Sequence, residues 1–374
     1  MDWLKMLGQL DGMSAVRVLA TFAITALLIP LCLPLAQKLG LYDLPGGRKQ
    51  HEQPTPYIGG ALILVAVAAG LFLFERDLSH ANIVFCFCAL VLVVVGLLDD
   101  RYDLSWRLRI AVQVLATLAM VYFADIRVQN LDDVFGVDKM YLGWLAVPFT
   151  VFIVVGVINA LNMIDGSDGL AAGQVMVSLL LFAGFALYAG NGPVAERLLA
   201  IAGAVAGFLI WNLRLPWQSR ARVFLGNAGS MLLGFVIALS AVRLTQNSAH
   251  PVSPVLGPWT VAIPLLDCVV LMFRRARQGR SPFSADRNHL HHYLLDAGYS
   301  ANQVAWGLAG LSLILGSTAA IAVKLGVHRP YVVLAFFVLL GVHYAFSADR
   351  DRAVAWLARG RQRLLSIKPD PEAA

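Results

Sequence analysis

The chain has 374 residues, of which 59% are hydrophobic and 14% are charged, and its formal net charge is +6. A soluble globular chain is roughly 45–50% apolar and about 25% charged, so this composition excludes both an ordinary soluble protein and a disordered chain. The apolar runs are long and unbroken, which excludes a β-barrel with its alternating strands. Because Lys and Arg accumulate in the cytoplasmic loops of membrane proteins, the positive charge indicates a membrane topology and gives no reason to expect a nucleic-acid partner.

Apolar runs that approach the length needed to cross a bilayer, about 20 residues, recur along the whole chain. They predict an all-α, polytopic integral membrane protein with about eleven spanning helices, and ten is the alternative because some runs are short. The expected spans are 16–36, 58–74, 81–98, 108–124, 142–160, 170–189, 198–213, 229–244, 257–272, 304–323 and 331–346. No linker separates them, so we expect one domain over 1–346 and a basic cytoplasmic tail over 347–374.

Positive charge is divided unevenly between the two sets of loops. Most of the 29 Lys and Arg residues fall on one side when the N-terminus is placed outside. The positive-inside rule therefore predicts an outer N-terminus and a cytoplasmic C-terminus. In that orientation five polar segments all face the cytoplasm, namely 43–60, 96–109, 159–173, 222–234 and 274–292.

The first polar segment, 43–60, is a turn-rich loop with several Pro and Gly residues. It carries Lys49 and His51 beside a point where the chain enters the membrane. On its own this segment is equally well interpreted as a positive-inside anchor.

The second polar segment ends an apolar helix with two adjacent carboxylates, Asp99 and Asp100. Charge at membrane depth is costly, and neighbouring carboxylates repel each other, so we expect a nearby cation or a raised pKa. Arg107 or Arg109, about two helical turns further on, could neutralise a phosphate. The alternative is a solvated helix end.

The third polar segment is the most informative, because it places Asn162, Asp165 and Asp168 three residues apart among glycines, without any Lys or Arg. Oxygen ligands in a hydrophobic neighbourhood suit a hard cation such as Mg²⁺. On a helix the three side chains share a face, and in a loop the glycines let them converge. The EF-hand pattern and its closing Glu are absent, which excludes an EF-hand.

The fourth polar segment, 222–234, is a glycine-rich turn that leads into a span. Backbone N–H groups at such a helix start favour phosphate. Asn227 or Ser230 could cap the helix or reach a ligand, and close helix packing through small residues is the alternative.

The fifth polar segment combines arginines with His289, His291 and His292. Arginine binds phosphate bidentately, and histidine can donate to phosphate or move a proton. A zinc site would need other support, since no Cys lies nearby and the acids elsewhere favour Mg²⁺. Upstream, Asp267 lies within the 257–272 span. We expect it either to pair with an arginine of the 273–303 loop or to mark a helix break.

Carboxylates, amides, arginines and histidines on one membrane face suit phosphoryl transfer, which needs positioning, a divalent cation and positive groups on phosphate oxygens. At the membrane surface, one substrate would be soluble and anionic and the other a lipid phosphate.

The chain resembles the polyprenyl-phosphate N-acetylhexosamine-1-phosphate transferase family. The matching segments follow the family's order over nearly the whole chain, and they are 43–60, 96–109, 158–173, 223–235, 250–267 and 274–292. Each segment alone is a weak signal, but their joint match is specific. The H-x-H-H ending at 289–292, after S-P-F-S-x-D-R at 281–287, is similar to the branch that uses UDP-N-acetylglucosamine.

The resemblance implies a Mg²⁺-dependent enzyme of the bacterial inner membrane, with Mn²⁺ as an alternative metal. Undecaprenyl phosphate would attack the β-phosphate of UDP-N-acetylglucosamine, release UMP and leave a lipid-linked primer for O-antigen or a related surface polysaccharide. Two alternatives stay open: another UDP-N-acetylhexosamine as donor, and a polytopic secondary transporter outside the family. The analogy also admits a homodimer, and membrane lipid is an expected partner.

The resemblance further implies roles for individual residues. Asp99 and Asp100 would act on the lipid phosphate, one of them as a base or positioning group. Asp168 would hold Mg²⁺ with Asp165 nearby. The substrate-binding set would consist of Lys49, His51, Arg109, Asn162, Phe224 at the uridine, and Arg275, His289, His291 and His292 at the diphosphate and sugar.

One position departs from the family pattern. The fourth polar segment usually reads F-x-G-D-x-G-S, and that Asp is a Mg²⁺ ligand in the family, whereas this chain has Asn227. An amide oxygen still binds a hard cation but brings no charge. We expect an active enzyme with Asn227 among the metal ligands. Either Asp165 compensates for the missing charge, or the metal affinity is lower, or the metal is arranged differently.

Overall fold

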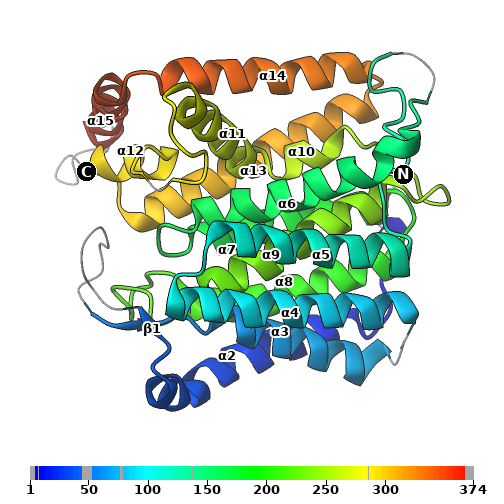
Figure 1. The fold of residues 1–374 in the computed structure, drawn as a ribbon, viewed down its shortest axis with the longest axis horizontal. Coiled ribbons are helices and arrows are strands. Elements are labelled where there is room, and N and C mark those ends of the chain that lie inside the picture. The colour runs from blue at the N-terminus through cyan, green and yellow to red at the C-terminus, as the bar shows by residue number, and fades with distance from the viewer. Residues whose placement is uncertain are drawn as a thin grey trace, which may run out of the picture.

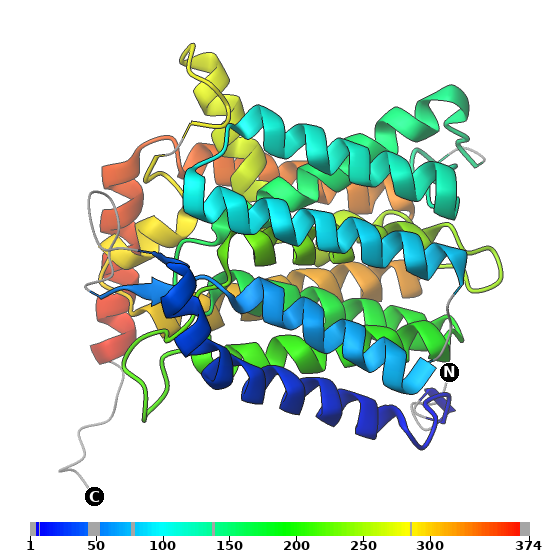
Figure 2. The same cartoon turned by 60° about the horizontal axis from the view of Figure 1, so that its bottom comes forward.

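The computed structural model describes residues 5–6, 8–43, 53–75, 79–136, 139–284 and 286–366, without the side chains of 75 and 364–366. These residues form a bundle of long helices that run side by side (Figure 1). The view turned by 60° shows the same arrangement (Figure 2). Nine of the described helices are long and apolar enough to cross a membrane. The chain is therefore a predominantly helical, polytopic membrane protein, as its composition predicts.

The bundle helices follow the apolar runs of the sequence. In chain order they are α2 (Ser14–Leu39), α3 (Gly59–Gly70) with its π-helical extension η1 (Leu71–Glu75), α4 (His80–Tyr102), α5 (Trp106–Ala124), the short turn η2 (Gly143–Leu145) before α6 (Ala146–Ile164), α7 (Leu170–Tyr188), α8 (Gly192–Asn212), α9 (Gly226–Thr245), α10 (Leu256–Thr260), α11 (Ala262–Arg277), α13 (Ala301–Lys324) and α14 (Arg329–Phe346). Two further helices, α12 (Leu290–Asp296) and α15 (Arg350–Ser366), lie at one end of the bundle, where β1 (Tyr42–Asp43) pairs antiparallel with β2 (Thr55–Pro56).

Two of the expected spans differ from a simple membrane helix. The run predicted at 58–74 forms α3 and η1, which together are shorter than the nine long helices. The run predicted at 257–272 breaks at Val261, where φ is −119°, into α10 and α11. Pro264 has no N–H to bond the carbonyl four residues earlier, which favours a break there. Eleven crossings therefore stay a prediction.

Glycines of α3 and α4 explain why these two helices meet the start of α9 so closely. A Cβ atom on Gly60 of α3 would lie 2.1 Å from the backbone nitrogen of Gly229, and one on Gly96 of α4 would lie 2.4 Å from Cα of Ala228. Only small residues permit such backbone contact. This packing brings the end of α4 and the start of α3 against the start of α9.

The bundle has two distinct ends. Strand β1, helix α12 and helix α15 lie at one end, and the start of α2 lies at the other (Figures 1 and 2). We call the first of these the site end. The outer N-terminus, the cytoplasmic C-terminus and the identity of the cytoplasmic end stay predictions. The small β1–β2 pair is an addition to the predicted all-α fold.

Candidate active site

The two adjacent carboxylates at the end of α4 face different neighbours. The Asp100 carboxylate accepts the backbone N–H of Asn227, with N–O distances of 2.9 and 3.1 Å. Asp99 is only 3% exposed and pairs through Oδ2 with Nη1 of Arg109 at 2.7 Å. Gly226 has a φ of +73°, and a Cβ there would lie 2.6 Å from Asp100 Oδ2. The Asp100 carboxylate can therefore reach the Asn227 N–H only because residue 226 is a glycine.

The amides Asn162 and Asn227 join the last turn of α6 to the first turn of α9. Asn162 Nδ2 donates to Asn227 Oδ1 at 2.6 Å and to Ser230 Oγ at 2.9 Å. Through the backbone of Asn227 this pair is also linked to Asp100. The structure thus brings residues from three of the polar segments into one cluster at the site end.

Asp165 and Asp168 follow α6 and differ in their partners. Asp168 pairs with Arg214 Nε at 2.7 Å and accepts the backbone N–H of Ala221 at 3.3 Å. Within the described ranges no group donates a hydrogen bond to the carboxylate of Asp165. Burial, followed by the negative charges of Asp100 and Asp168, raises the pKa of Asp165 to about 7. A carboxylate so placed needs a proton or a cation. We call Asp100, Asn162, Asp165 and Asn227 the acid cluster.

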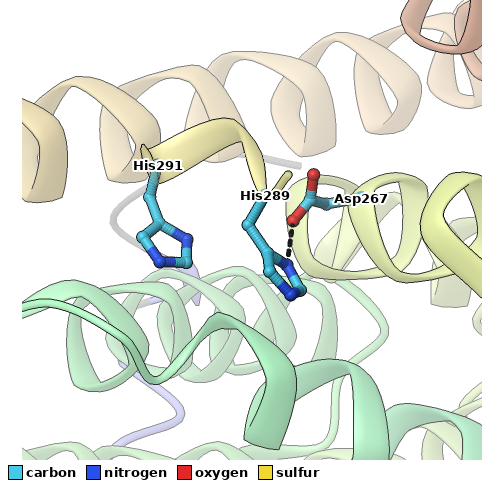
Figure 3. A group of neighbouring side chains, drawn as sticks. All are labelled: Asp267, His289 and His291. Atoms are coloured by element: carbon cyan, nitrogen blue, oxygen red, sulfur yellow. Dashed lines mark hydrogen bonds and ion pairs between the residues drawn. The ribbon is translucent and has the colours of Figure 1, made fainter. Parts of the chain in front are cut away.

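The histidines of the fifth polar segment lie at the start of α12 (Figure 3). The His291 ring is 1% exposed, and neither of its nitrogens has a partner among the described residues. A Cβ on Gly166 would lie 2.5 Å from His291 Nε2, so this ring touches the backbone beside Asp165. His289 and His292 have their ring centroids 5.4 and 4.1 Å from that of His291. The histidines therefore border the acid cluster.

Two histidines of this group, His291 and His292, are neutral at pH 7. Burial, together with His292 and His289, lowers the pKa of His291 to about 3. Burial, together with His289 and Arg287, lowers the pKa of His292 to about 4. Neutral imidazoles offer one donor and one acceptor each, so they suit hydrogen bonding to a polar substrate.

Asp267 was expected to pair with an arginine or to mark a helix break, and both expectations are wrong. Its Oδ2 lies 2.8 Å from His289 Nδ1, and its Oδ1 lies 3.3 Å from His343 Nε2. The helix break lies at Val261, more than a turn earlier. A lone acid inside an apolar run is a signal for a functional residue. The partners of Asp267 come from α12 and α14, so the sequence around Asp267 does not predict them.

Arg275 orders the loop before α12, and its expected role at the diphosphate stays a prediction. It is 3% exposed, pairs through Nε with Asp286 at 2.9 Å and donates from Nη1 to the Pro282 carbonyl at 2.8 Å. Burial raises the pKa of Asp286, but the Arg275 hydrogen bond and the backbone of Asn288 outweigh burial and leave the pKa below its usual value. Phe283 of the same loop stacks on Trp106, with ring centroids 4.7 Å apart.

The structure says less about the remaining residues that were predicted to bind substrate. Lys49 and His51 lie outside the described residues. The backbone of Phe224 bonds to strand β2 through the Pro56 carbonyl at 2.8 Å and to Gly59 N–H at 3.1 Å. Arg109 holds Asp99, as described above. The contacts of Phe224 and Arg109 fix their positions at the site end, and the roles of both toward a substrate stay predictions.

Two donor sets at the site end could hold a metal ion. The acid cluster offers carboxylate and amide oxygens, which suit a hard cation such as Mg²⁺. Asp267, His289 and His291 offer ligand atoms that all lie within 4.8 Å of one another, a set with nitrogen that suits softer metals. The acid cluster is therefore the better site for Mg²⁺.

Comparison with known proteins places this site in a family. Residues 82–245, which run from α4 to the end of α9 and include the acid cluster, match the model of glycosyl transferase family 4. Relatives 33% identical to this chain match over 93% of it and carry the name undecaprenyl-phosphate alpha-N-acetylglucosaminyl 1-phosphate transferase. The chain belongs to this family, and it is a phosphoglycosyltransferase. Family membership removes the secondary transporter as an alternative.

Three curated relatives share one name, undecaprenyl-phosphate alpha-N-acetylglucosaminyl 1-phosphate transferase. The protein of Escherichia coli K12 is 33% identical over 348 residues, which are 93% of this chain and 94% of the relative. The Yersinia pestis protein is 36% identical over 332 residues, or 88% and 90% of the two chains. The Haemophilus influenzae protein is 32% identical over 352 residues, or 94% and 99%.

Proposed function

We propose that this enzyme transfers N-acetylglucosamine 1-phosphate from UDP-N-acetylglucosamine to undecaprenyl phosphate. An oxygen of the lipid phosphate forms a bond to the β-phosphorus of the nucleotide sugar, and the bond from that phosphorus to the UMP oxygen breaks. The products are undecaprenyl-diphospho-N-acetylglucosamine and UMP. The names of the relatives support this choice of substrates.

The observation that carries the proposal is the acid cluster and its neighbours. Asp100, Asp165 and Asn227 come from three separate segments and meet at the end of a membrane bundle, with the neutral His291 against the same loop. A lipid phosphate reaches such a site along the bilayer, and a soluble nucleotide reaches it from the aqueous side. Phosphoryl transfer requires positioning and charge neutralisation of this kind.

The acid cluster fits a bound Mg²⁺, and Mn²⁺ would be an alternative. Asp165 has no hydrogen-bond donor among the described residues, and burial, followed by the charges of Asp100 and Asp168, raises its pKa, which a bound cation would offset. Asp165 and the Asn227 amide oxygen would hold the ion, with Asp100 beside them. When bound, the metal would neutralise charge on the phosphate oxygens.

We assign the two carboxylates of α4 different roles. Asp99 is buried and holds Arg109, so this pair is the group that positions the lipid phosphate. Asp100 receives the N–H of Asn227 and lies near Asp165, so it belongs to the metal side of the site. Asp168, tied to Arg214, supports the loop that carries Asp165.

The proposed setting is the bacterial inner membrane with the site end toward the cytoplasm, where UDP-sugars are made. The basic segment 273–303 and the Arg-rich helix α15 at this end support that orientation. The lipid product would be the primer for O-antigen or a related surface polysaccharide. A homodimer is compatible with this proposal but is not required by it.

Purified protein in detergent tests the choice of donor. With undecaprenyl phosphate and Mg²⁺ present, UDP-N-acetylglucosamine, UDP-N-acetylgalactosamine and UDP-MurNAc-pentapeptide are supplied separately, and UMP and lipid-linked sugar are measured. We expect UMP from UDP-N-acetylglucosamine alone. UMP only from another nucleotide sugar would contradict the donor and favour the alternative UDP-N-acetylhexosamine. No UMP from any donor would contradict the proposed reaction.

A further inference from the structure

A buried carboxylate lies behind the histidine group, outside the acid cluster. Asp267 of α11 is 3% exposed. Its Oδ2 contacts His289 Nδ1 at 2.8 Å, and its Oδ1 accepts the backbone N–H of Leu290 at 3.0 Å. Both contacts are made to the first residues of α12. Asp267 therefore fixes both the start of α12 and the first histidine on it.

This contact selects the orientation and the tautomer of His289. A carboxylate accepts the proton on Nδ1, which leaves Nε2 as the nitrogen available for other partners. Figure 3 shows the ring with Nδ1 on Asp267 and its other nitrogen pointing away from the carboxylate. The same arrangement orients histidines in many active sites, where the carboxylate touches no substrate.

The oriented ring is continuous with the acid cluster. His289 stacks on His291, with an interplanar angle of 27°, and His291 lies against Gly166, next to Asp165. A shift of His289 would therefore be transmitted to the wall of the proposed substrate site. His289 lies between Asp267 and that site. Asp267 itself makes no contact with the acid cluster among the described residues.

We infer that Asp267 is a positioning residue of the transferase, acting through the Nδ1–H of His289 so that His289 and His291 present fixed nitrogens to the diphosphate of the nucleotide sugar. This inference rests on the proposed function for its substrate. The second partner, His343 of α14, contacts Oδ1 at 3.3 Å, the oxygen that also accepts the Leu290 N–H, and makes no contact with His289. His343 therefore supports Asp267 but does not position the substrate.

A double-mutant cycle separates positioning from simple structural support. The variants are Asp267→Ala, His289→Ala, the double variant and Asp267→Asn, with kcat and KM for the nucleotide sugar as readouts. We expect Asp267→Ala and His289→Ala each to lower kcat about 10- to 100-fold, and the double variant to be no worse than His289→Ala. Asp267→Asn keeps an acceptor for Nδ1–H, so it should restore part of the loss. Additive losses, or an unchanged kcat in Asp267→Ala, would overturn the inference.

Two controls address loss of packing. His343→Ala removes the other contact of Asp267 and should change kcat less than about 3-fold, because His289 keeps its partner. Asp133→Asn removes an ion pair with Arg329 at the start of α14, 3.2 Å long, and should leave kcat unchanged. If Asp267→Ala lowers thermal stability no more than Asp133→Asn does, its kinetic loss is not due to unfolding. A loss in His343→Ala equal to that in Asp267→Ala would contradict a role through His289.

A spectroscopic arm tests the inference even if the proposed reaction fails. In ¹⁵N-histidine-labelled protein, solid-state NMR distinguishes the two imidazole tautomers, and His289→Ala identifies the His289 signals. We expect a protonated Nδ1 in the wild type and loss of that preference in Asp267→Ala. The same signals in both proteins would overturn the inference. Stoichiometric zinc in the purified protein, lost in Asp267→Ala, would also overturn it, because Asp267 would then be a metal ligand.

Discussion

Asn227 contributes to the acid cluster with both its backbone and its side chain. The N–H is bound by Asp100, and Oδ1 is bound by Asn162. Where the family resemblance expects a carboxylate, this chain has an amide, so the proposed metal site carries one negative charge fewer. Charge count is one of the factors that set the affinity of an oxygen site for a divalent cation.

Asn227→Asp tests whether this position is a metal ligand. The added carboxylate should lower the Mg²⁺ concentration for half-maximal activity about 3- to 10-fold, since one more charge faces the ion. The measurement is a Mg²⁺ titration of UMP release in wild type and variant. An identical Mg²⁺ dependence in the two proteins would show that residue 227 does not bind the ion.

Asp165 and Asp168 were both predicted as ligands, and the structure gives them different surroundings. We expect Asp165→Asn to lower kcat at least about 100-fold, because its carboxylate has no other described partner and faces the proposed ion. Asp168→Asn should cost less, about 10-fold, since it breaks the pair with Arg214 that supports the loop. Steady-state kinetics at saturating Mg²⁺ measure both. The reverse order of losses would return the ligand role to Asp168.

For single residues, the sequence predicted which residues belong to the candidate site better than it predicted which residues they contact. The acids and histidines of the site stand in recognisable motifs, so Asp100, Asp165 and His291 could be selected from those motifs alone. The Asp168–Arg214 pair spans 46 positions, and Asp267 meets His289 across 22. Such partners depend on how helices cross, which local sequence does not encode.

At the scale of helices, the apolar runs located the spans correctly. Pairing between polar residues explains where the observed helix bounds differ from the expected ones. The run expected from residue 198 begins at Gly192 instead, because Asn191 caps the helix and accepts the Val194 N–H. Glu196 near this start is paired with Arg17 and accepts from Ser14 of α2. A hydropathy window excludes such charged residues, although their charges are satisfied by a neighbouring helix.

The contact of α3 with α9 is a second test at the scale of elements. Gly60→Ala would place a Cβ 2.1 Å from the Gly229 nitrogen, so α3 must move away from the start of α9. We expect a lower unfolding temperature in detergent and at least about a 10-fold loss of activity, because Asn227 moves with α9. Gly184→Ala is the matched control.

Gly184 lies inside α7, and a Cβ atom added there would have nothing within 4 Å of it. Alanine there should leave activity unchanged and raise stability slightly, by up to about 1 kcal/mol. Equal effects of the two substitutions on stability and activity would contradict a special role for the α3–α9 contact.

For the whole molecule, the separation of the two ends is the central feature. Helices α12 and α15 and strand β1 lie at the site end, and the loop after α9 lies at the opposite end (Figures 1 and 2). Charge counting predicted this division, since the basic loops and the polar motifs fell on the same side. A break in the ninth span was expected only as an alternative at Asp267, and it lies at Val261 instead, because hydropathy is continuous there and does not locate the interruption.

Cysteine labelling tests the orientation. Ser248, in the loop after α9, and Gln362 of α15 are both exposed, at opposite ends of the bundle. In spheroplasts, an impermeant maleimide should label Ser248→Cys directly and Gln362→Cys only after the membrane is opened. The wild type, whose cysteines are buried or half-buried within helices, is the background control. Labelling of Gln362→Cys in sealed spheroplasts would contradict a cytoplasmic site end.

The destination of the β-phosphorus tests the proposed reaction most directly. UDP-N-acetylglucosamine labelled with ³²P at the β-position is incubated with the enzyme, undecaprenyl phosphate and Mg²⁺, and the lipid and aqueous phases are separated. We predict that the label enters the lipid phase in a one-to-one ratio with UMP release, and that chelation of Mg²⁺ stops both. Label that stays in water as UDP while sugar enters the lipid would show transfer of the sugar without its phosphate, and would contradict phosphoryl transfer at the acid cluster.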